Sequence, residues 1–530
     1  MVHRPTRRER EPLLSVAYGS TEARVLDPTN AVAVDGVNAR STIYSSSVLL
    51  ISKSVDFEDT FKRIEKAAKG LGWRAIAEDE PECAVGLRFG VRRVRLGVRP
   101  GKAAQAPDAW TVLQYLRSEG AENVRGVSLE HVLVPAPIAD PKPHNQPHPH
   151  NQPHPHNQPH PHNQPHPHNQ PHPHNQPHPY GQSFADGYDP LGTGGRSPVA
   201  YVGARPRRLT SAEMDGRERP VVAVLDTGCG PHPWLDFVQR DARLDGHPIG
   251  WPQSVPDSEV DGDQVGALDG LIDPLAGHGT FISGLIHQAC PDAEILSWRI
   301  VPPEGPIAET DWITALAQIA ELVDLYRNGD PRGRRIDVLN LSMGYYHETP
   351  SDPYFDPTLY EVLADLLRNG TVVVCAAGND ATDRPVFPAA FAPWSDGEGP
   401  ITPEPGVLPI VSVGALNPSG RSDALFSNAG PWVRAYEIGA GVVSTFPPSF
   451  DGGYQSVIET EFEGRDRASL DIDDFTGGFG TWSGTSFAAP LLAGRIAQRL
   501  FESGPAADAA AATKRAWAVL EQLTPLRSGQ

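Results

Sequence analysis

Residues 221–228 read VVAVLDTG, five apolar residues followed by an aspartate, a threonine and a glycine. Two later stretches have a similar form, DVLNLSMG at residues 337–344 and TVVVCAAGN at residues 371–379. Such largely apolar runs are typical of parallel strands that are covered on both faces of their sheet. The three stretches therefore predict the centre of a parallel sheet with polar or small residues at its strand ends.

Helical and extended patterns alternate around these strands. Further strands are predicted at residues 294–300 and 408–415, and helices at residues 311–328 and 357–369 and from His278 and about Ser486 onward. This alternation indicates a doubly wound α/β fold over residues 201–530. In such a fold, functional side chains gather at the carboxyl ends of the strands.

Four short motifs stand at the ends of these elements: DTG at 226–228, GHGT at 277–280, AAGN at 376–379 and GTSFAAP at 484–490. Taken singly, Asp226, His278 and Ser486 could each be a helix cap or an ordinary surface residue. Acyl transfer, however, needs a nucleophilic hydroxyl, an imidazole base, a carboxylate that orients it and donors for the oxyanion. The combination predicts Ser486 as nucleophile, His278 as general base and Asp226 as its orienting partner.

The stretches VAVLDTG, GHGTFISG, VLNLSMG, AAGN and GTSFAAPLLAG resemble, in this order, the signature blocks of the subtilase family, peptidase S8. The chain order Asp, His, Ser is also that of subtilisin. The resemblance implies a subtilisin-like serine endopeptidase that works through an acyl-enzyme, with Asn379 in the oxyanion hole. It also implies residues that flank the P1 side chain of the substrate, namely Ser342, Met343, Gly344, Ala376, Ala377 and Gly378. Phe487 and Leu491 stand where the family commonly has Met and His, and neither position carries chemistry.

Two other functions fit parts of the sequence. D-T-G is also the catalytic triplet of aspartic peptidases, but these need two such aspartates, and the chain has no second D-T-G or D-S-G. A catalytically silent subtilase-like binding module usually lacks a member of the triad, whereas all three are present here. The silent module is kept as the alternative.

Composition excludes several classes of protein. A net charge of −20 over 530 residues argues against nucleic-acid binding, and no apolar run is long enough for a signal peptide or a membrane span. The four cysteines are widely spaced, which suggests neither a disulfide framework nor a zinc site. We expect a cytoplasmic protein that acts on proteins or peptides and needs no cofactor. A calcium ion with no assigned ligands is left open as an alternative.

The sequence HNQPHP occurs six times in succession at residues 144–179, inside a Pro-rich stretch at 137–200. Two prolines in every repeat and no other apolar side chain predict a disordered, extended linker. Its twelve histidines could also bind Zn, Cu or Ni ions.

Before this linker, residues 45–136 alternate as strand, helix, strand, strand, helix and strand, after an N-terminal tail at 1–44. The strands are expected at 45–53, 73–78, 83–98 and 125–134, and the helices at 56–72 and 107–120. This order predicts a small ferredoxin-like α+β domain. Its position and element order resemble the prodomains that precede many subtilase catalytic domains, which implies an inhibitor that binds in cis. An unrelated partner-binding domain is the alternative.

Two acidic segments flank the predicted active site along the chain. We expect both on the rim of the substrate cleft, where they would favour Lys or Arg near the scissile bond. A solvated acidic surface or a calcium site is the alternative. The residues concerned are Asp257, Glu259, Asp261, Asp263, Asp269, Asp273, Glu459, Glu461, Glu463, Asp471, Asp473 and Asp474.

Overall fold

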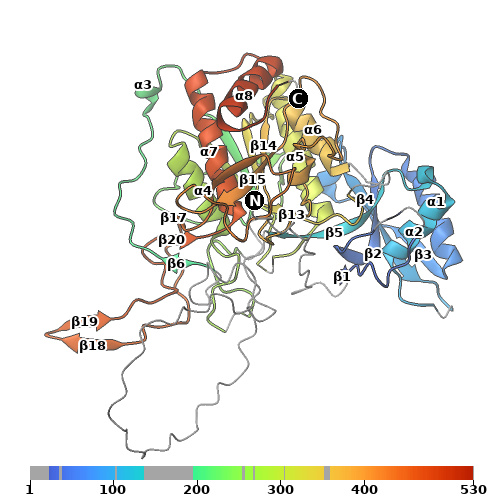
Figure 1. Cartoon of the computed structure of the whole chain (residues 1–530), viewed down its shortest axis with the longest axis horizontal. Coiled ribbons are helices and arrows are strands. Elements are labelled where there is room, and N and C mark those ends of the chain that lie inside the picture. Colours follow the sequence, from blue (N-terminus) through green and yellow to red (C-terminus); the bar gives the residue numbers. More distant parts are fainter. Residues whose placement is uncertain are drawn as a thin grey trace, which may run out of the picture.

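The computed structural model of the chain contains a small N-terminal domain beside a larger α/β body (Figure 1). It describes residues 23–34, 37, 39–101, 104–135, 195–252, 257–266, 269–303, 305–350 and 358–528. Most of the predicted linker and about half of the predicted tail therefore lie outside the described residues.

A six-stranded, wholly parallel sheet forms the centre of the larger body. Its strand order is β10-β7-β12-β14-β15-β16. The chain runs from β7 to one neighbour, β10, and returns to the other, β12, so the order reverses at β7. In open α/β sheets this reversal opens a crevice at the carboxyl ends of the strands. The strands are β7 (Val221–Asp226), β10 (Glu294–Arg299), β12 (Val338–Leu341), β14 (Val372–Ala376), β15 (Val411–Leu416) and β16 (Ala435–Ile438).

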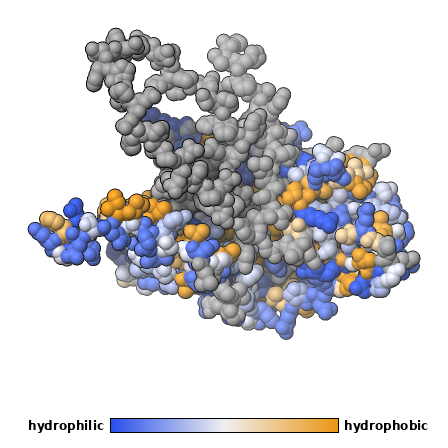
Figure 2. Space-filling model, turned by 90° about the horizontal axis from the view of Figure 1, so that it is seen from below, coloured by the Kyte–Doolittle hydropathy of each residue, from blue (hydrophilic) through white to orange (hydrophobic). Residues whose placement is uncertain are grey.

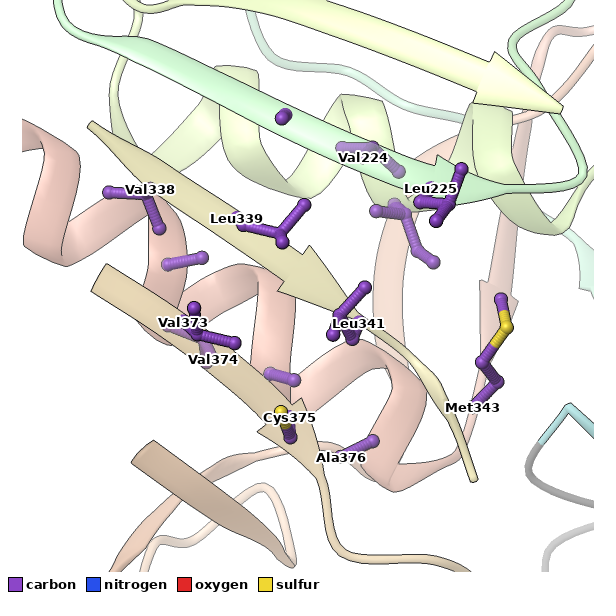
Figure 3. Packing of buried hydrophobic residues seen from close by; sticks show 14 of the residues in the cluster. Val224, Leu225, Val338, Leu339, Leu341, Met343, Val373, Val374, Cys375 and Ala376 are labelled. Carbon is purple, nitrogen blue, oxygen red and sulfur yellow. The ribbon is translucent and has the colours of Figure 1, made fainter. Parts of the chain in front are cut away.

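Helices cover both faces of this sheet, as the near-continuous apolar strands require. The side chains of β7, β12 and β14 interleave in the core, and all of them are buried (Figure 3). The doubly wound α/β fold is thus confirmed. The helices are α4 (His278–Ala289), α5 (Glu309–Arg327), α6 (Thr358–Arg368), α7 (Thr485–Ser503) and α8 (Ala509–Leu523).

The N-terminal domain has the predicted β-α-β-β-α-β order and an antiparallel sheet ordered β5-β2-β4-β3, which confirms the ferredoxin-like fold. Asp56 and Asp108 cap its two helices by accepting the backbone N–H groups of Asp59 and Thr111. The elements are β2 (Ile43–Ser52), α1 (Phe57–Gly70), β3 (Trp73–Ala77), β4 (Val91–Val98), α2 (Ala109–Glu119) and β5 (Val127–Pro135).

The predicted strand at 83–98 is wrong in its first half. Residues Glu82–Ala84 form a 3-10 turn, η1, and the glycines Gly86 and Gly90 have φ of +83° and +138°. Positive φ interrupts an extended chain, so β4 begins only at Val91. A strand that the sequence did not predict, β1 (Ala23–Val25), pairs with β2.

Strand β5 continues out of the N-terminal domain into the larger body. It pairs antiparallel with β11 (Ile307–Ala308) through Val132 and Leu133, and with β13 (Met343–Gly344) through Val134 and Pro135. Around this junction, Arg88 of the small domain binds Glu321, Asp324 and Asp365 of the larger one. The two domains therefore share one seven-stranded sheet.

Short elements complete the larger body. A small sheet ordered β17-β20-β6 includes Ser197–Pro198, so the folded unit extends to residues before the predicted boundary at 201. The hairpin β18–β19 projects from the body as an exposed arm (Figures 1 and 2). The remaining elements are β6 (Ser197–Pro198), α3 (Ser211–Met214), β8 (Arg243–Leu244), β9 (His247–Pro248), β17 (Val442–Thr445), β18 (Glu459–Phe462), β19 (Arg465–Ala468), β20 (Phe479–Trp482), η2 (Ala121–Asn123) and η4 (Ala389–Phe391).

The prediction of an acidic cleft rim is wrong for five of its twelve side chains. Glu259, Asp273 and Asp473 are buried, and Glu459 and Glu461 lie on the projecting arm. Burial depends on contacts between distant segments, which a local run of acidic residues does not reveal. The preference for Lys- or Arg-bearing substrates stays a prediction. Among the described residues, no helix has the length and apolar character needed to cross a bilayer.

Candidate active site

Asp226 is the last residue of β7, at the edge of the sheet where the strand order reverses. The side chain is fully buried. Its Oδ1 lies 2.6 Å from Nδ1 of His278 and also accepts the backbone N–H of Thr227 at 2.8 Å. A buried carboxylate at this distance holds the hydrogen of the imidazole on Nδ1 and leaves Nε2 as the basic nitrogen.

His278 is the first residue of α4, which begins after Gly277 in a left-handed conformation with φ of +83°. The imidazole lies edge-on to Trp482 and tilted against Phe487, with ring centroids 5.5 and 5.2 Å apart. Its Nε2 is buried and has no hydrogen-bond partner among the described residues. Because Phe487 follows Ser486 directly, this packing brings the imidazole of His278 to the start of α7.

Ser486 is the second residue of α7 and is only 2% exposed. Pro490 has no N–H to offer to the carbonyl of Ser486 four residues earlier. That carbonyl instead accepts the hydroxyl of Ser342 at 3.1 Å, while the hydroxyl of Ser486 donates to the carbonyl of Ser342 at 3.3 Å. The second bond is long, so the structure holds the Ser486 hydroxyl loosely.

Asn379 follows β14 and lies beside the same helix start. Its Oδ1 accepts the backbone N–H and the hydroxyl of Thr485, at 2.8 and 2.9 Å. Thr485 Oγ1 in turn accepts the N–H of Gly378 at 3.0 Å. With the amide oxygen occupied in this way, the two N–H donors of the amide are left for another acceptor next to Ser486.

The predicted substrate-binding residues fall into two groups. Met343 and Gly344 form β13 and pair with β5 through their backbones, while the Met343 side chain is buried in the core (Figure 3). Ala376 ends β14 and Ala377 follows it, both with buried side chains, and Gly378 has φ of +95°. These residues can therefore contact a substrate only through their backbone groups. Binding of the substrate by these residues and by the buried Ser342 stays a prediction.

One buried acid beside this site was not recognised as such from the sequence. Glu259 is fully buried and accepts hydrogen bonds from the hydroxyls of Thr227 and Thr280. Burial raises its pKa to about 7, although these two hydrogen bonds act in the opposite direction. Asp257 and Asp261 are acidic residues of the same short run. The sequence therefore gives no sign that Glu259 is the one that is buried.

Cys229 follows the DTG motif and has a buried side chain, and burial raises the pKa of its thiol to about 11. All four cysteines are free. His131, His347 and Glu348 are described side chains close enough to share a metal ion. Both ring nitrogens of His131 already face carboxylates, and Nδ1 of His347 accepts the N–H of Thr349. A calcium site stays a prediction without assigned residues.

Comparison with known proteins identifies a family. The model of the subtilase family matches residues 217–517, which is more than half of the chain. The chain is 24% identical over 290 residues to the major intracellular serine protease of Bacillus subtilis (strain 168) and 26% identical over 290 residues to the intracellular serine protease of Paenibacillus polymyxa. Each match covers 52% of this chain and just under two thirds of the relative, 66% and 65% respectively.

The chain also resembles a solved structure, that of fervidolysin from Fervidobacterium pennivorans, a keratinolytic enzyme related to subtilisin. The superposition covers 89% of this chain and 56% of the fervidolysin chain. The overlap has a TM-score of 0.44 at 18% identity, which is too loose to bear on fold or function. The family match spans β7, α4, β14 and the start of α7, where the four motifs lie. The chain therefore belongs to the subtilase family.

Proposed function

We propose that this chain is a serine endopeptidase in which Ser486 attacks the scissile carbonyl while His278 takes up the hydroxyl proton. The observation that carries the proposal is the 2.6 Å contact between Asp226 and Nδ1 of His278, which leaves Nε2 as the base. Asp226 fixes the tautomer and stabilises the imidazolium that forms. His278 then gives the proton to the leaving amine, and an acyl group remains on Ser486 until water removes it.

The oxyanion of the tetrahedral intermediate needs donors that are in place before the reaction. We assign this role to the amide N–H of Asn379 and the backbone N–H of Ser486. Thr485 holds the amide oxygen of Asn379, so the amide cannot turn without breaking two hydrogen bonds. The N-terminus of α7 adds a partial positive charge at the same place.

A fluorophosphonate probe tests this proposal, because it reacts with an activated serine and not with an ordinary one. In protein freed of residues 1–194, we expect labelling at Ser486, located by mass spectrometry, and no labelling of the Ser486→Ala variant. A folded protein freed of residues 1–194 that stays unlabelled would instead support the catalytically silent binding module.

We further propose protein or peptide substrates, no nucleic-acid or membrane partner and a cytoplasmic location. The named relatives are proteases, and both are called intracellular. A net charge of −20 opposes binding to polyanions.

We also propose that the N-terminal domain inhibits the catalytic domain in cis. The supporting observation is that β5 adds a strand between β11 and β13. Met343 and Gly344 of β13 are among the predicted substrate-binding residues, so β5 takes the place of an extended substrate. The covalent link keeps the inhibitor at high local concentration while the chain is uncut.

Added in trans, residues 23–135 are expected to inhibit peptide hydrolysis by residues 195–530 at micromolar concentration or below. Both boundaries follow the structure, since β1 pairs with β2 and Ser197–Pro198 pairs with β20. The inhibition constant is measured with a chromogenic peptide, and refolding of the catalytic unit is followed in parallel.

Two variants provide matched controls for this experiment. Arg88→Ala removes contacts of 3.1 Å to Glu321 and Asp365 across the interface and is expected to weaken inhibition about tenfold, typical of a partly exposed charge network. Lys66→Ala removes only a pair within the small domain, with Glu119, and should change nothing. If residues 23–135 neither assist refolding nor inhibit, the domain is a partner-binding module.

A further inference from the structure

The carboxylate of Glu259 lies where the strand that carries Asp226 meets the helix that carries His278. Its Oε1 accepts the Thr227 hydroxyl and the N–H of Gly279, the latter at 3.2 Å, and its Oε2 accepts the Thr280 hydroxyl and N–H. Four donors therefore converge on one fully buried acid. The first turn of α4 also favours a negative charge there.

The backbone segments around this acid approach one another so closely that two positions have room only for glycine. A Cβ atom on Gly279 would lie 2.0 Å from the carbonyl oxygen of Gly228, and one on Gly230 would lie 2.2 Å from the carbonyl oxygen of Glu259. Two glycines thus let the DTG turn, the start of α4 and the segment of Glu259 approach one another closely. Glu259 cannot touch a substrate from this position, because it is covered on all sides.

The hydroxyl of Thr227 connects Glu259 to the Asp226–His278 pair. Thr227 Oγ1 accepts the N–H of Gly279 at 2.8 Å and has one hydrogen to give. Two acceptors face that hydrogen, Oε1 of Glu259 and, at 3.2 Å, Oδ1 of Asp226, which also binds His278. When Glu259 is ionised, the Thr227 hydroxyl donates its hydrogen to Glu259. When Glu259 is protonated, its own hydroxyl donates to Thr227 Oγ1, and the Thr227 hydroxyl then donates to Asp226.

We propose that Glu259 is a positioning residue of the active site, which ties Asp226 to His278 and controls through Thr227 how strongly Asp226 holds the imidazole. This inference rests on the proposed peptidase function. A hydrogen bond from Thr227 to Asp226 would withdraw negative charge from the oxygen that binds His278, so the protonated state of Glu259 is the less active one.

The charged groups around Glu259 set the pH at which this change occurs. Asp226 and Asp257 face it with negative charge, and both raise its pKa together with burial. Arg299 lies near by, paired with Asp257 at 3.6 Å, and packs with Glu259 against Gly228. The thiol of Cys229 and the imidazole of His278 complete the titratable neighbours. A pKa of about 7 makes the change fall near neutral pH.

The test uses Glu259→Gln, because glutamine has the shape of a glutamic acid that stays neutral. The variant is made as the full chain, and its activity is measured after the linker is cut and the N-terminal domain is diluted away. We expect kcat to fall by about 10²-fold, the scale of a small misplacement of catalytic groups, while KM stays within about twofold. In the wild type, protonation of Glu259 adds one proton to those that lower kcat/KM on the acid side, so the logarithm of kcat/KM should fall more steeply with pH than in the variant, by up to one unit of slope. The variant should lack this extra slope, whereas Asp241→Asn, at an exposed acid of the same domain, should behave as the wild type.

A second pair of variants keeps the proposal testable if Glu259→Gln does not fold. Thr227→Val removes the connecting hydroxyl at similar volume, and Thr227→Ser retains it. We expect the valine variant to share the shallower pH profile of Glu259→Gln and the serine variant to share the steeper profile of the wild type. Wild-type kcat and slope in folded Glu259→Gln, or equal profiles for the two Thr227 variants, would overturn the inference. Retained turnover in Ser486→Ala would instead reject the peptidase function itself.

Discussion

Ser486→Ala is expected to reduce peptide hydrolysis by about 10⁶-fold, the loss measured for the corresponding change in subtilisin, a member of the same family. The substitution removes the only atom that we assign to nucleophilic attack. The fold should survive, because the hydroxyl contributes one long hydrogen bond to Ser342 and the side chain sits at a helix start. Turnover is measured with a chromogenic peptide and folding by thermal unfolding.

Ser483→Ala is the matched control for this variant. Ser483 lies three residues earlier and accepts the N–H of Gly441 at 2.9 Å, away from the site we describe. Its turnover should stay within about twofold of the wild type. Hydrolysis by purified Ser486→Ala at more than about a thousandth of the wild-type rate would reject Ser486 as the nucleophile.

Inhibition by the N-terminal domain is expected to weaken by up to about 10³-fold as the pH rises from 6.5 to 10. The cause is His131, in β5, which is completely buried between two acids of the catalytic domain. Its Nδ1 lies 2.6 Å from Glu309 and its Nε2 2.8 Å from Glu348. A neutral imidazole has one N–H only, so two such contacts require the imidazolium.

The sign follows from the proton linkage between the docked and the free domain. Burial alone would lower the pKa of His131, but Glu309 and Glu348 outweigh it and raise the pKa to about 10 in the docked state. The ordinary value of 6.5 applies once the ring is free. Docking is therefore strongest below about pH 6.5 and loses up to tenfold in affinity for each pH unit above it, until His131 loses its proton near pH 10.

The other titratable groups beside His131 keep the same charge between pH 6.5 and 10. Burial lowers the pKa of His347 to about 4, so it stays neutral across the range. Arg117, from α2, lies 3.7 Å from Glu348 and keeps its charge. Burial opposes ionisation of Glu348, yet His347, His131 and Arg117 hold its pKa well below the usual range.

The measurement is the inhibition constant of residues 23–135 against residues 195–530 between pH 6 and 10. His131→Phe keeps the stacking of the ring on Tyr345, at 4.4 Å between centroids, but should bind weakly and without pH dependence. His247→Gln, in β9 of the catalytic domain, should leave the slope unchanged. An inhibition constant that is flat with pH for the wild type would contradict this account of His131.

The sequence predicts the parallel sheet well because its signal is local. The runs at β7, β12 and β14 are largely apolar, and β7 and β14 each end at the residue where a motif begins. Strand β16, in contrast, alternates buried and exposed residues at the sheet edge and was not predicted. The exposed arm β18–β19 has no buried residue, so no periodicity marks it.

In the candidate site, too, the residues in local motifs were predicted and those defined by distant contacts were not. Asp226, His278, Asn379 and Ser486 stand in motifs, and the structure gathers them at one edge of the sheet. Glu259 and His131 have no motif, because their roles depend on what surrounds them. Glu259 needs four donors from two other segments, and His131 needs two acids about 180 and 220 residues away along the chain.

Strand β5 pairs with strands of both domains, and this affects how the two domains separate. Its residues Val127–Leu129 belong to the sheet of the small domain, and the pairing to β11 and β13 follows within the next few residues. The tail therefore cannot peel out of the cleft one residue at a time while its own domain stays in place. Departure becomes an all-or-none event, and we expect activation after dilution to follow a single exponential whose rate does not depend on where the linker has been cut.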